Sequence, residues 1–363
     1  MLIRSLQKAI EYSKRLSENQ PHGITFEEIL PETVIESQDP ILSTALSPSG
    51  KFLTIGRQNG YLDVVNVEAG KLLSQYPQPK RDDNEPVIAT KFGTDDSILA
   101  FASCSGDVYL CNFQKNKSHI LKGCPKHSSL LSMDLSISSS PHVVTGYKDG
   151  SIRIYDVNAA KVIKEISKSS QSEEDESIAH GMRVTAVKWI PSGYDNAFLS
   201  SGWDNVTKMW DIRLPNPLVV KFHGAKVYGE GLDVKDRLIL AACWAKEDQL
   251  QVFDMAKGQR ILAATSPFNC DYFYSGRIVS TLNSGGVSLK ALVGGCAGVM
   301  SLIGVNQEPN GDMEVSSLAT FMPELDETGK SATINCIDAK WISAKVSVVV
   351  GLNNGRCYIC KIL

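Results

Sequence analysis

The sequence predicts an all-β fold, a seven-bladed β-propeller, on the strength of three observations. A hairpin pattern repeats along the chain, and each copy is preceded by a further apolar run. Most copies are followed by another such run, so the unit has four strands at a spacing of about 50 residues, which is typical of propeller blades. The final copy lacks its fourth run, and a strand-like segment precedes the first copy.

Each hairpin consists of an apolar run, a turn that contains Gly, Asn or Asp, and a second run that ends near an acidic residue or Asn. Asn-Gly and Asp-Gly turns between alternating residues are a strong hairpin signal. The clearest copy is "SSGWDNVTKMWDIR" (200–213), in which two Trp-Asp pairs bracket the run "NVTKM". The seven hairpins span residues 51–67, 97–113, 142–157, 197–212, 237–255, 288–305 and 345–362.

The two ends of the chain are expected to complete one blade together. The seventh unit stops at "RCYICKIL", its third strand, whereas "GITFEEILPETVIE" (23–36) precedes the first unit. An open sheet edge would expose unpaired backbone groups. We therefore expect residues 21–36 to supply the outer strand of the last blade, within a propeller that spans residues 21–363.

Residues 1–20 predict a short amphipathic helix in front of this propeller. Three roles fit such a helix, namely packing on the propeller, binding a partner, or targeting as a mitochondrial presequence. Glu11 interrupts the basic face, which argues against the presequence. The apolar residues at helical spacing are Leu2, Ile3, Leu6, Ile10 and Leu16.

Composition argues against a general nucleic-acid-binding, membrane-spanning or disulfide-rich protein. The net charge of −3 gives no global attraction to nucleic acid or anionic membranes. The longest apolar run, "VSVVVGL" (346–352), is far shorter than the roughly 20 residues that cross a bilayer. Nine cysteines, an odd number scattered through apolar runs, indicate free thiols in a reducing compartment. We expect a cytoplasmic protein, with the nucleus as a second location.

The fourth unit resembles the WD-repeat family most closely, and the resemblance extends from about residue 22 to the end of the chain. Its residues at the family positions are His180, Ser200, Asp204 and Trp210. In that family these four side chains form a hydrogen-bonded chain inside one blade, so the resemblance implies the same chain here. Such a buried polar chain is stable only when every member is paired.

Other units match the family pattern less completely. The third unit matches in part through Thr145, Asp149 and Tyr155, with His127 one residue out of register. The fifth unit repeats "HGMRV" (180–184) as "HGAKV" (223–227). Where the pattern has its turn aspartate, three units have another residue: Asn59, Ser105 and Asn354.

The sequence offers little sign of chemistry. "ETGKS" (327–331) ends like a phosphate-binding loop, but Glu324 stands where the first glycine is required. Cys357 and Cys360 lie in one predicted strand, where positions three apart face opposite sides, so the two thiolates are badly placed for one metal ion. We expect no catalytic residue, no metal and no cofactor, and an enzyme with an axial pocket is the least favoured class.

The leading functional hypothesis is a non-catalytic scaffold that presents partners on the loop-rich top face. In the WD-repeat family the residue before the turn aspartate projects onto that face. Here it is Trp203, and Trp244 has a comparable place in the next blade. Exposed tryptophans are frequent binding hot spots. The alternative is that each indole only covers its own hairpin turn.

A second hypothesis is a substrate receptor of a cullin–RING ubiquitin ligase. The chain resembles such receptors in "WDIR", Trp210-Asp211-Ile212-Arg213, with Arg213 as the expected contact to the ligase adaptor. Under either hypothesis we expect a monomeric propeller within a larger complex. The expected partners are other proteins or peptides, with no nucleic acid and no membrane.

An acidic stretch, "SSQSEEDES" (169–177), connects the third and fourth blades. It reads as a solvated loop or as a phosphorylation site, because Ser170 and Ser172 each have an acidic residue three positions on.

Overall fold

A computed structural model describes residues 28–76, 85–113, 115, 117–121, 128–138, 141–168, 178–191, 196–265, 272–282, 287–324, 331–342 and 345–362. These residues form β-strands and contain no α-helix, so the all-β prediction is confirmed. The helix expected over 1–20, His127 and the two candidate phosphorylation sites, Ser170 and Ser172, lie outside the described residues.

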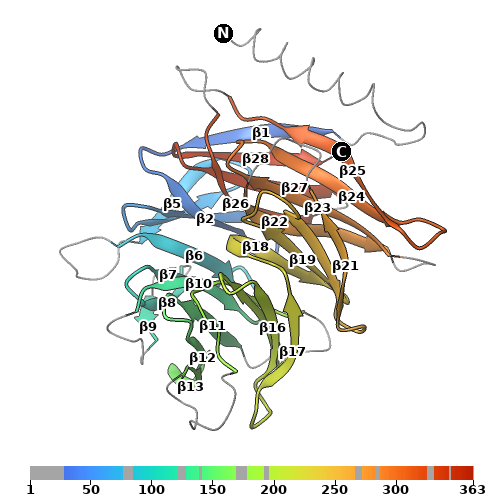
Figure 1. The fold of residues 1–363 in the computed structure, drawn as a ribbon. Coiled ribbons are helices and arrows are strands. Elements are labelled where there is room, and N and C mark those ends of the chain that lie inside the picture. The colour runs from blue at the N-terminus through green and yellow to red at the C-terminus, as the bar shows by residue number, and fades with distance from the viewer. Residues whose placement is uncertain are drawn as a thin grey trace.

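The strands group into antiparallel sheets of four that follow the order of the chain (Figure 1). The first unit contains β2 (Ile41–Leu46), β3 (Phe52–Arg57), β4 (Leu62–Asn66) and β5 (Lys71–Tyr76). The second contains β6 (Val87–Phe92), β7 (Ile98–Ser103), β8 (Val108–Asn112) and β9 (Lys117–Ile120). The third contains β10 (Leu130–Leu135), β11 (His142–Tyr147), β12 (Ile152–Asp156) and β13 (Lys161–Ile166).

The fourth unit contains β14 (Val184–Trp189), β15 (Ala197–Gly202), β16 (Val206–Asp211) and β17 (Leu218–His223). The fifth contains β18 (Val227–Lys235), β19 (Leu238–Cys243), β20 (Leu250–Asp254) and β21 (Gln259–Ala264). The sixth contains β22 (Phe273–Leu282), β23 (Ser288–Gly295), β24 (Met300–Gln307) and β25 (Met313–Phe321). One parallel pair, Glu230 with Ser275, joins the fifth and sixth units into a continuous eight-stranded sheet.

The last unit combines both ends of the chain. It contains β26 (Ile334–Ile342), β27 (Lys345–Leu352), β28 (Arg356–Ile362) and, outermost, β1 (Ile29–Glu36). Strand β1 runs antiparallel to β28, from Ile29 opposite Ile362 to Glu36 opposite Arg356. Figure 1 shows the two strands side by side although they come from opposite ends of the chain.

The innermost strands form a closed circuit. Strands β2, β6, β10, β14, β18, β22 and β26 each pack against the next, and β26 packs against β2. Among the described residues each of these seven strands is the innermost strand of a four-stranded unit, which supports the predicted count of seven blades.

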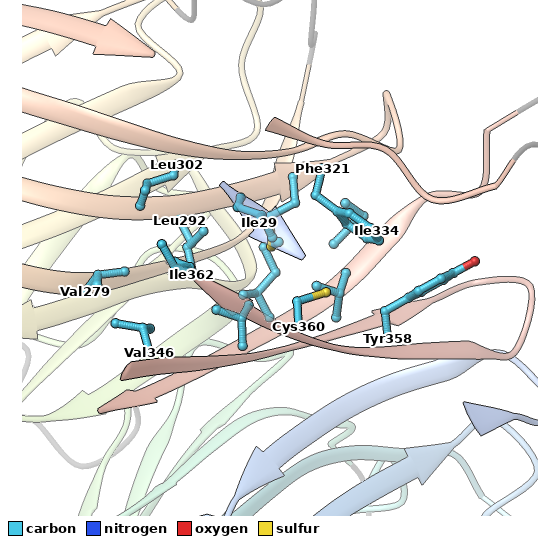
Figure 2. Packing of buried hydrophobic residues seen from close by; sticks show 14 of the residues in the cluster. Ile29, Val279, Leu292, Leu302, Phe321, Ile334, Val346, Tyr358, Cys360 and Ile362 are labelled. Atoms are coloured by element: carbon cyan, nitrogen blue, oxygen red, sulfur yellow. The ribbon is translucent and has the colours of Figure 1, made fainter. Parts of the chain in front are cut away.

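The hydrophobic cores lie between neighbouring units rather than within one sheet. One cluster joins Ile154 of the third unit to Trp210 of the fourth. Another buries Ile29 of β1 among residues of the sixth and last units, as Figure 2 shows for Ile362, Cys360 and Phe321. Each unit is therefore stabilised by apolar contacts with its two neighbours, and β1 takes part in the contacts between the sixth and last units.

Candidate functional site

Seven equivalent backbone hydrogen bonds define one face of the propeller. In each unit the residue directly after the second strand donates its N–H to the carbonyl of the residue directly before the first strand, over 2.8–3.2 Å. We call these fourteen residues the turn face. The donor and acceptor pairs are Gln58 and Pro40, Cys104 and Pro86, Lys148 and Ser129, Trp203 and Arg183, Trp244 and Lys226, Cys296 and Tyr272, and Asn353 and Thr333.

The turn face is not uniform around the ring. The fourth and fifth units carry Trp203 with Arg183 and Trp244 with Lys226, and the sixth carries Tyr272. The first, second and last units carry proline, threonine, cysteine and amide side chains at these positions. The third unit carries Lys148 with Ser129. The large aromatic side chains of the turn face are therefore confined to one sector, the fourth to sixth units, which contains both tryptophans singled out in the sequence.

Five side chains of this sector form a continuous aromatic cluster, which we call the aromatic arc: Trp203, Tyr228, Trp244, Tyr272 and Tyr274. Tyr228 links the two tryptophans, with ring centroids 6.0 Å from Trp203 and 5.4 Å from Trp244. Trp244 lies 4.4 Å from Tyr272 and 4.8 Å from Tyr274. These separations are those of stabilising aromatic pairs. Tyr228 is 37% exposed and both indoles are half-buried, so the arc reaches the surface.

Two cations lie on the Trp203 end of the arc. The guanidinium of Arg183 is 4.3 Å and the ammonium of Lys226 is 4.8 Å from the centre of the Trp203 ring. These are cation–π distances. Within the described part of the chain neither cation has a carboxylate at ion-pair distance.

A hydrogen-bonded chain beneath this sector fixes the turn that carries Trp203. His180 Nδ1 lies 2.8 Å from Asp204 Oδ2, and His180 Nε2 lies 2.7 Å from Ser200 Oγ. Trp210 Nε1 donates to the same Ser200 oxygen over 2.7 Å. The Gly181 N–H also donates to Asp204, which ties the segment before Arg183 to the residue after Trp203. The structure thus links the four side chains that the family resemblance singled out.

The buried environment sets the charge state of this chain. Burial lowers the pKa of His180 despite the nearby Asp204, so the imidazole is neutral at pH 7. Burial alone would raise the pKa of Asp204, but its hydrogen bonds with His180 and Gly181 lower it overall. A neutral imidazole therefore donates to an ionised carboxylate, and the ring orientation is fixed by a partner on each nitrogen.

Close packing of the backbone also holds Trp203 beside Arg183. Gly202 immediately precedes Trp203, and a Cβ there would collide with the Arg183 carbonyl. Gly295 precedes Cys296 in the sixth unit and approaches the Tyr272 carbonyl in the same way. Glycine is required at both positions because a side chain would push the two segments of the turn face apart.

In the third unit the candidate side chains have hydrogen-bond partners close to them in the sequence. The Thr145 hydroxyl donates to the Arg153 carbonyl, 3.3 Å away, and the Asp149 carboxylate accepts from Ser151 in its own turn. The Tyr155 hydroxyl lies 3.0 Å from that of Tyr147. In the family pattern the histidine joins the hydroxyl residue to the aspartate, and the candidate here, His127, lies outside the described residues. The chain expected for Thr145, Asp149 and Tyr155 therefore stays a prediction.

Arg213 lies far from the turn face along its own strand. Trp203 precedes β16 and Arg213 follows it, so the two residues are at opposite ends of that strand. The Arg213 guanidinium is 68% exposed and pairs with Asp211 Oδ2 over 2.6 Å. Trp210 is fully buried, so of the "WDIR" residues Arg213 offers the most accessible side chain.

An axial cavity of about 240 Å³ is lined by charged side chains of the innermost strands. Lys91 pairs with Glu230 and Lys188 with Asp233, each over 3.1 Å, while Arg277 pairs with Glu230 and Asp338. The charge alternates from unit to unit at one position of the innermost strand: Lys91, Asp134, Lys188, Asp233, Arg277 and Asp338, with Ala45 in the first unit. The lining is balanced in charge and extensively ion-paired.

The described residues show neither a metal-ligand cluster nor a membrane-spanning helix. No group of three or more His, Cys, Asp or Glu side chains is placed to hold a metal ion there. Cys357 and Cys360 pack in two different hydrophobic clusters, as expected for positions three apart in a strand. No helix in the described part of the chain is long and apolar enough to span a bilayer.

Sequence reasoning missed much of the aromatic arc. Tyr228, Tyr272 and Tyr274 join it through tertiary packing, which no local motif signals. Arg183 and Lys226 could have been found from the sequence, because "HGMRV" and "HGAKV" place them at equivalent positions of consecutive units.

Comparisons with known proteins agree with this geometry. A family model described as WD domain, G-beta repeat matches residues 174–211, and one described as Anaphase-promoting complex subunit 4 WD40 domain matches residues 90–192. The first match covers the unit that contains His180, Ser200, Asp204 and Trp210.

Similar curated proteins include the U3 small nucleolar RNA-associated protein 21 homolog of Schizosaccharomyces pombe, 25% identical over 172 residues. That match covers 47% of this chain and 17% of the relative. Methylosome protein WDR77 of Xenopus laevis is 30% identical over 121 residues, 33% of each chain. Nuclear distribution protein PAC1 of Arthroderma otae is 24% identical over 189 residues, 50% of this chain and 37% of the relative. The chain thus spans less than two fifths of each of these relatives.

Proposed function

We propose that this chain, which contains WD40 repeats in a β-propeller fold, is a non-catalytic scaffold that holds a partner protein on its turn face. WD40 repeat proteins act as protein-interaction scaffolds and are generally non-catalytic. The aromatic arc supports the proposal for this chain in particular. Rigid aromatic side chains at a surface supply large contact areas at low cost in conformational entropy.

The position of the arc on the fold is what makes it suitable for binding. Trp203 and Trp244 begin equivalent turns of adjacent units, and each turn is fixed by a backbone hydrogen bond to the same unit. The His180–Asp204 bond adds a second restraint next to Trp203. A partner would therefore meet a preorganised surface, which reduces the entropy lost on binding.

Co-purification from cells that produce the protein natively tests this function. We expect Trp203→Ala to keep the wild-type melting temperature within a few degrees and to lose specific protein partners, at about 2 kcal/mol or more in affinity. Arg213→Ala, at the other end of β16, is the matched control and should keep those partners. If Trp203→Ala lowers stability and retains every partner, the indole only covers its turn.

A substrate receptor of a cullin–RING ubiquitin ligase is the second candidate function. The observation in its favour is that Arg213 projects into solvent directly after β16, held by Asp211. In that case Arg213→Ala should remove ligase-adaptor subunits from the co-purified material, and Trp203→Ala should remove only the substrate. Equal recovery of adaptor with wild type and Arg213→Ala would exclude this candidate.

We propose a protein partner rather than a nucleic acid, and a monomeric propeller within a larger complex. The relative from Schizosaccharomyces pombe is named for its association with U3 small nucleolar RNA, but the match covers 17% of it. The net charge of −3 gives this chain no general affinity for phosphate backbones. The name of that relative supports a nuclear location beside the cytoplasmic one.

We propose no catalytic role for the axial cavity and no bound cofactor. Its charged side chains form ion pairs with one another, and the carboxylates of Asp134, Asp233 and Asp338 also accept backbone N–H groups from neighbouring units. These contacts support a structural role, because every one of those carboxylates already has a partner that holds it in place.

A further inference from the structure

We propose that the partner of the aromatic arc is an acidic peptide segment, in which Asp or Glu side chains flank a large apolar residue. The inference rests on the proposed function and adds the chemistry of the ligand. The apolar residue would pack on the Trp203–Tyr228–Trp244 surface, and the carboxylates would pair with Arg183 and Lys226.

The first argument is the charge of the turn face. Its fourteen residues include the cations Lys148, Arg183 and Lys226 and contain no Asp or Glu. All three cations belong to the third, fourth and fifth units, next to or within the sector that carries the arc. The chain as a whole has 40 acidic and 37 basic residues, so the positive charge of the turn face is opposite in sign to the net charge of the chain. A positive patch favours an oppositely charged partner.

The second argument is that Arg183 and Lys226 form no ion pair with any carboxylate of the described residues. Other cations near the ring axis, such as Lys91, Lys188 and Arg277, each pair with a carboxylate. Arg183 and Lys226 instead contact the Trp203 ring, and both side chains are half-buried. A carboxylate that reaches them would meet two cations beside an apolar ring, where screening by water is weaker than on an open surface.

The third argument concerns the direction in which the peptide would lie. Two cations, Arg183 and Lys226, lie at the Trp203 end of the arc, where the carboxylate of Asp204 already binds His180 and the Gly181 N–H. The turn after Trp244 carries charges of both signs, Lys246, Glu247 and Asp248. The acidic residues of the peptide are therefore expected to lie beside Trp203 and its apolar residue toward Trp244.

Two other ligand chemistries fit the arc less well. A methylated lysine would need an open aromatic face, but two cations already contact the Trp203 ring and would repel it. Single-stranded nucleic acid would need rings free for base stacking. Trp244 is already stacked on Tyr272, with an interplanar angle of 26°.

A selection from random dodecapeptides displayed on phage, with the full chain as bait, tests the proposal. We expect the enriched peptides to combine Asp or Glu with an aromatic or large aliphatic residue. A synthetic copy of the best peptide should bind about tenfold more weakly to Arg183→Gln and to Lys226→Gln, a change of about 1.4 kcal/mol. Arg213→Gln removes an equal charge elsewhere and should leave the affinity for the peptide unchanged. All three variants should keep the wild-type melting temperature.

The outcomes separate this inference from the proposed function. If neutral or basic peptides are enriched and lose affinity for Trp203→Ala but not for Arg183→Gln, the docking face stands and the acidic ligand is wrong. If no enriched peptide is sensitive to Trp203→Ala, the proposed function fails as well. An oligouridine probe that binds more tightly than the best peptide, and is weakened by the same charge variants, would overturn the proposal in favour of RNA.

Discussion

At the scale of single residues, two aspartates that follow tryptophans seven positions apart have different surroundings. Asp204 accepts from His180 and from the Gly181 N–H, and His180 is fully buried. Asp211 accepts from Arg213, whose side chain is mostly in solvent. The two aspartate side chains are about equally exposed, 13% and 14%, but Asp204 holds a buried histidine whereas Asp211 holds an exposed arginine.

We expect Asp204→Ala to lower the free energy of unfolding by about 1–3 kcal/mol, because it leaves buried donors unpaired. Asp211→Ala should cost less than about 1 kcal/mol, since it removes a surface ion pair. Chemical denaturation of both variants and wild type measures the difference. Equal midpoints for the two variants would refute the assignment of the buried role to Asp204.

His180 should make stability depend on pH. Burial lowers its folded-state pKa below the ordinary value near 6.5. The unfolded chain therefore binds a proton that the folded chain rejects, and stability is lost as pH falls through 6.5 toward the folded-state pKa. The slope should approach about 1.4 kcal/mol per pH unit for this one proton. Denaturation between pH 7.5 and 5.5 should show a shallower decline for His180→Gln, and identical slopes would contradict the explanation.

Local spacing predicted some of these residues and not others. His180, Ser200, Asp204 and Trp210 could be singled out because their roles depend on positions within one repeated unit. In the third unit the same reasoning stays a prediction, because His127 lies outside the described residues; the Tyr155 hydroxyl contacts Tyr147, a partner that the spacing did not indicate. Tyr228 and Tyr274 could not be foreseen, because their contacts depend on how two neighbouring units meet.

At the scale of elements, β1 is the strand on which closure of the ring depends. Its residues differ in burial: the Ile29 side chain is buried, with 7% exposed, whereas Val34 is 45% exposed. Ile29 packs with residues of the sixth and last units (Figure 2). Surface ion pairs, such as Lys361 with Glu32, add contacts along its other side.

Ile29→Ala should destabilise the protein by about 2–5 kcal/mol, because it leaves a cavity in the core between two units. Val34→Ala on the same strand should change stability by less than about 0.5 kcal/mol. Removal of residues 1–40 should unfold or aggregate the protein, whereas removal of 1–18 should be mild. Cooperative melting of the chain from residue 41 at the wild-type temperature would show that β1 is dispensable.

Most strands were foreseeable because turn residues and alternating apolar residues mark them locally. The pairing of β1 with β28 was inferred from the missing fourth run, and the structure pairs these strands from Ile29 to Glu36. The parallel contact between Glu230 and Ser275 was not foreseen, because β18 carries an irregularity between Val227 and Leu232 that no turn motif announces.

At the scale of the whole molecule, alternating charges around the axis join the units. Asp134, Asp233 and Asp338 each accept a backbone N–H from the next unit over 2.8 Å. Burial alone would raise the pKa of Asp233 and Asp338, but neighbouring cations lower both. This pattern is visible in the sequence only after the innermost strands have been aligned, which is why motif reasoning overlooked it.

Arg277→Met should test the importance of this charge network. The side chain is 6% exposed and pairs with Glu230 and Asp338, so its loss leaves Glu230 with Lys91 as its remaining ion-pair partner and Asp338 with the Leu46 N–H. We expect a cost of about 3–5 kcal/mol. Lys361→Met, which removes an exposed pair with Glu32, should cost no more than about 1 kcal/mol. A cost for Arg277→Met as small as that of the control would show that the axial charges do not hold the units together.

The central claim is that a partner protein docks on the aromatic sector of the turn face. Hydrogen–deuterium exchange of the full chain, alone and bound to a co-purified partner, tests it most directly. We expect slower exchange in the bound state over residues 181–184, 203–206, 226–229 and 244–247, with no change over 211–216. Slower exchange over 211–216 with an unchanged turn face would contradict the claim and favour docking through Arg213.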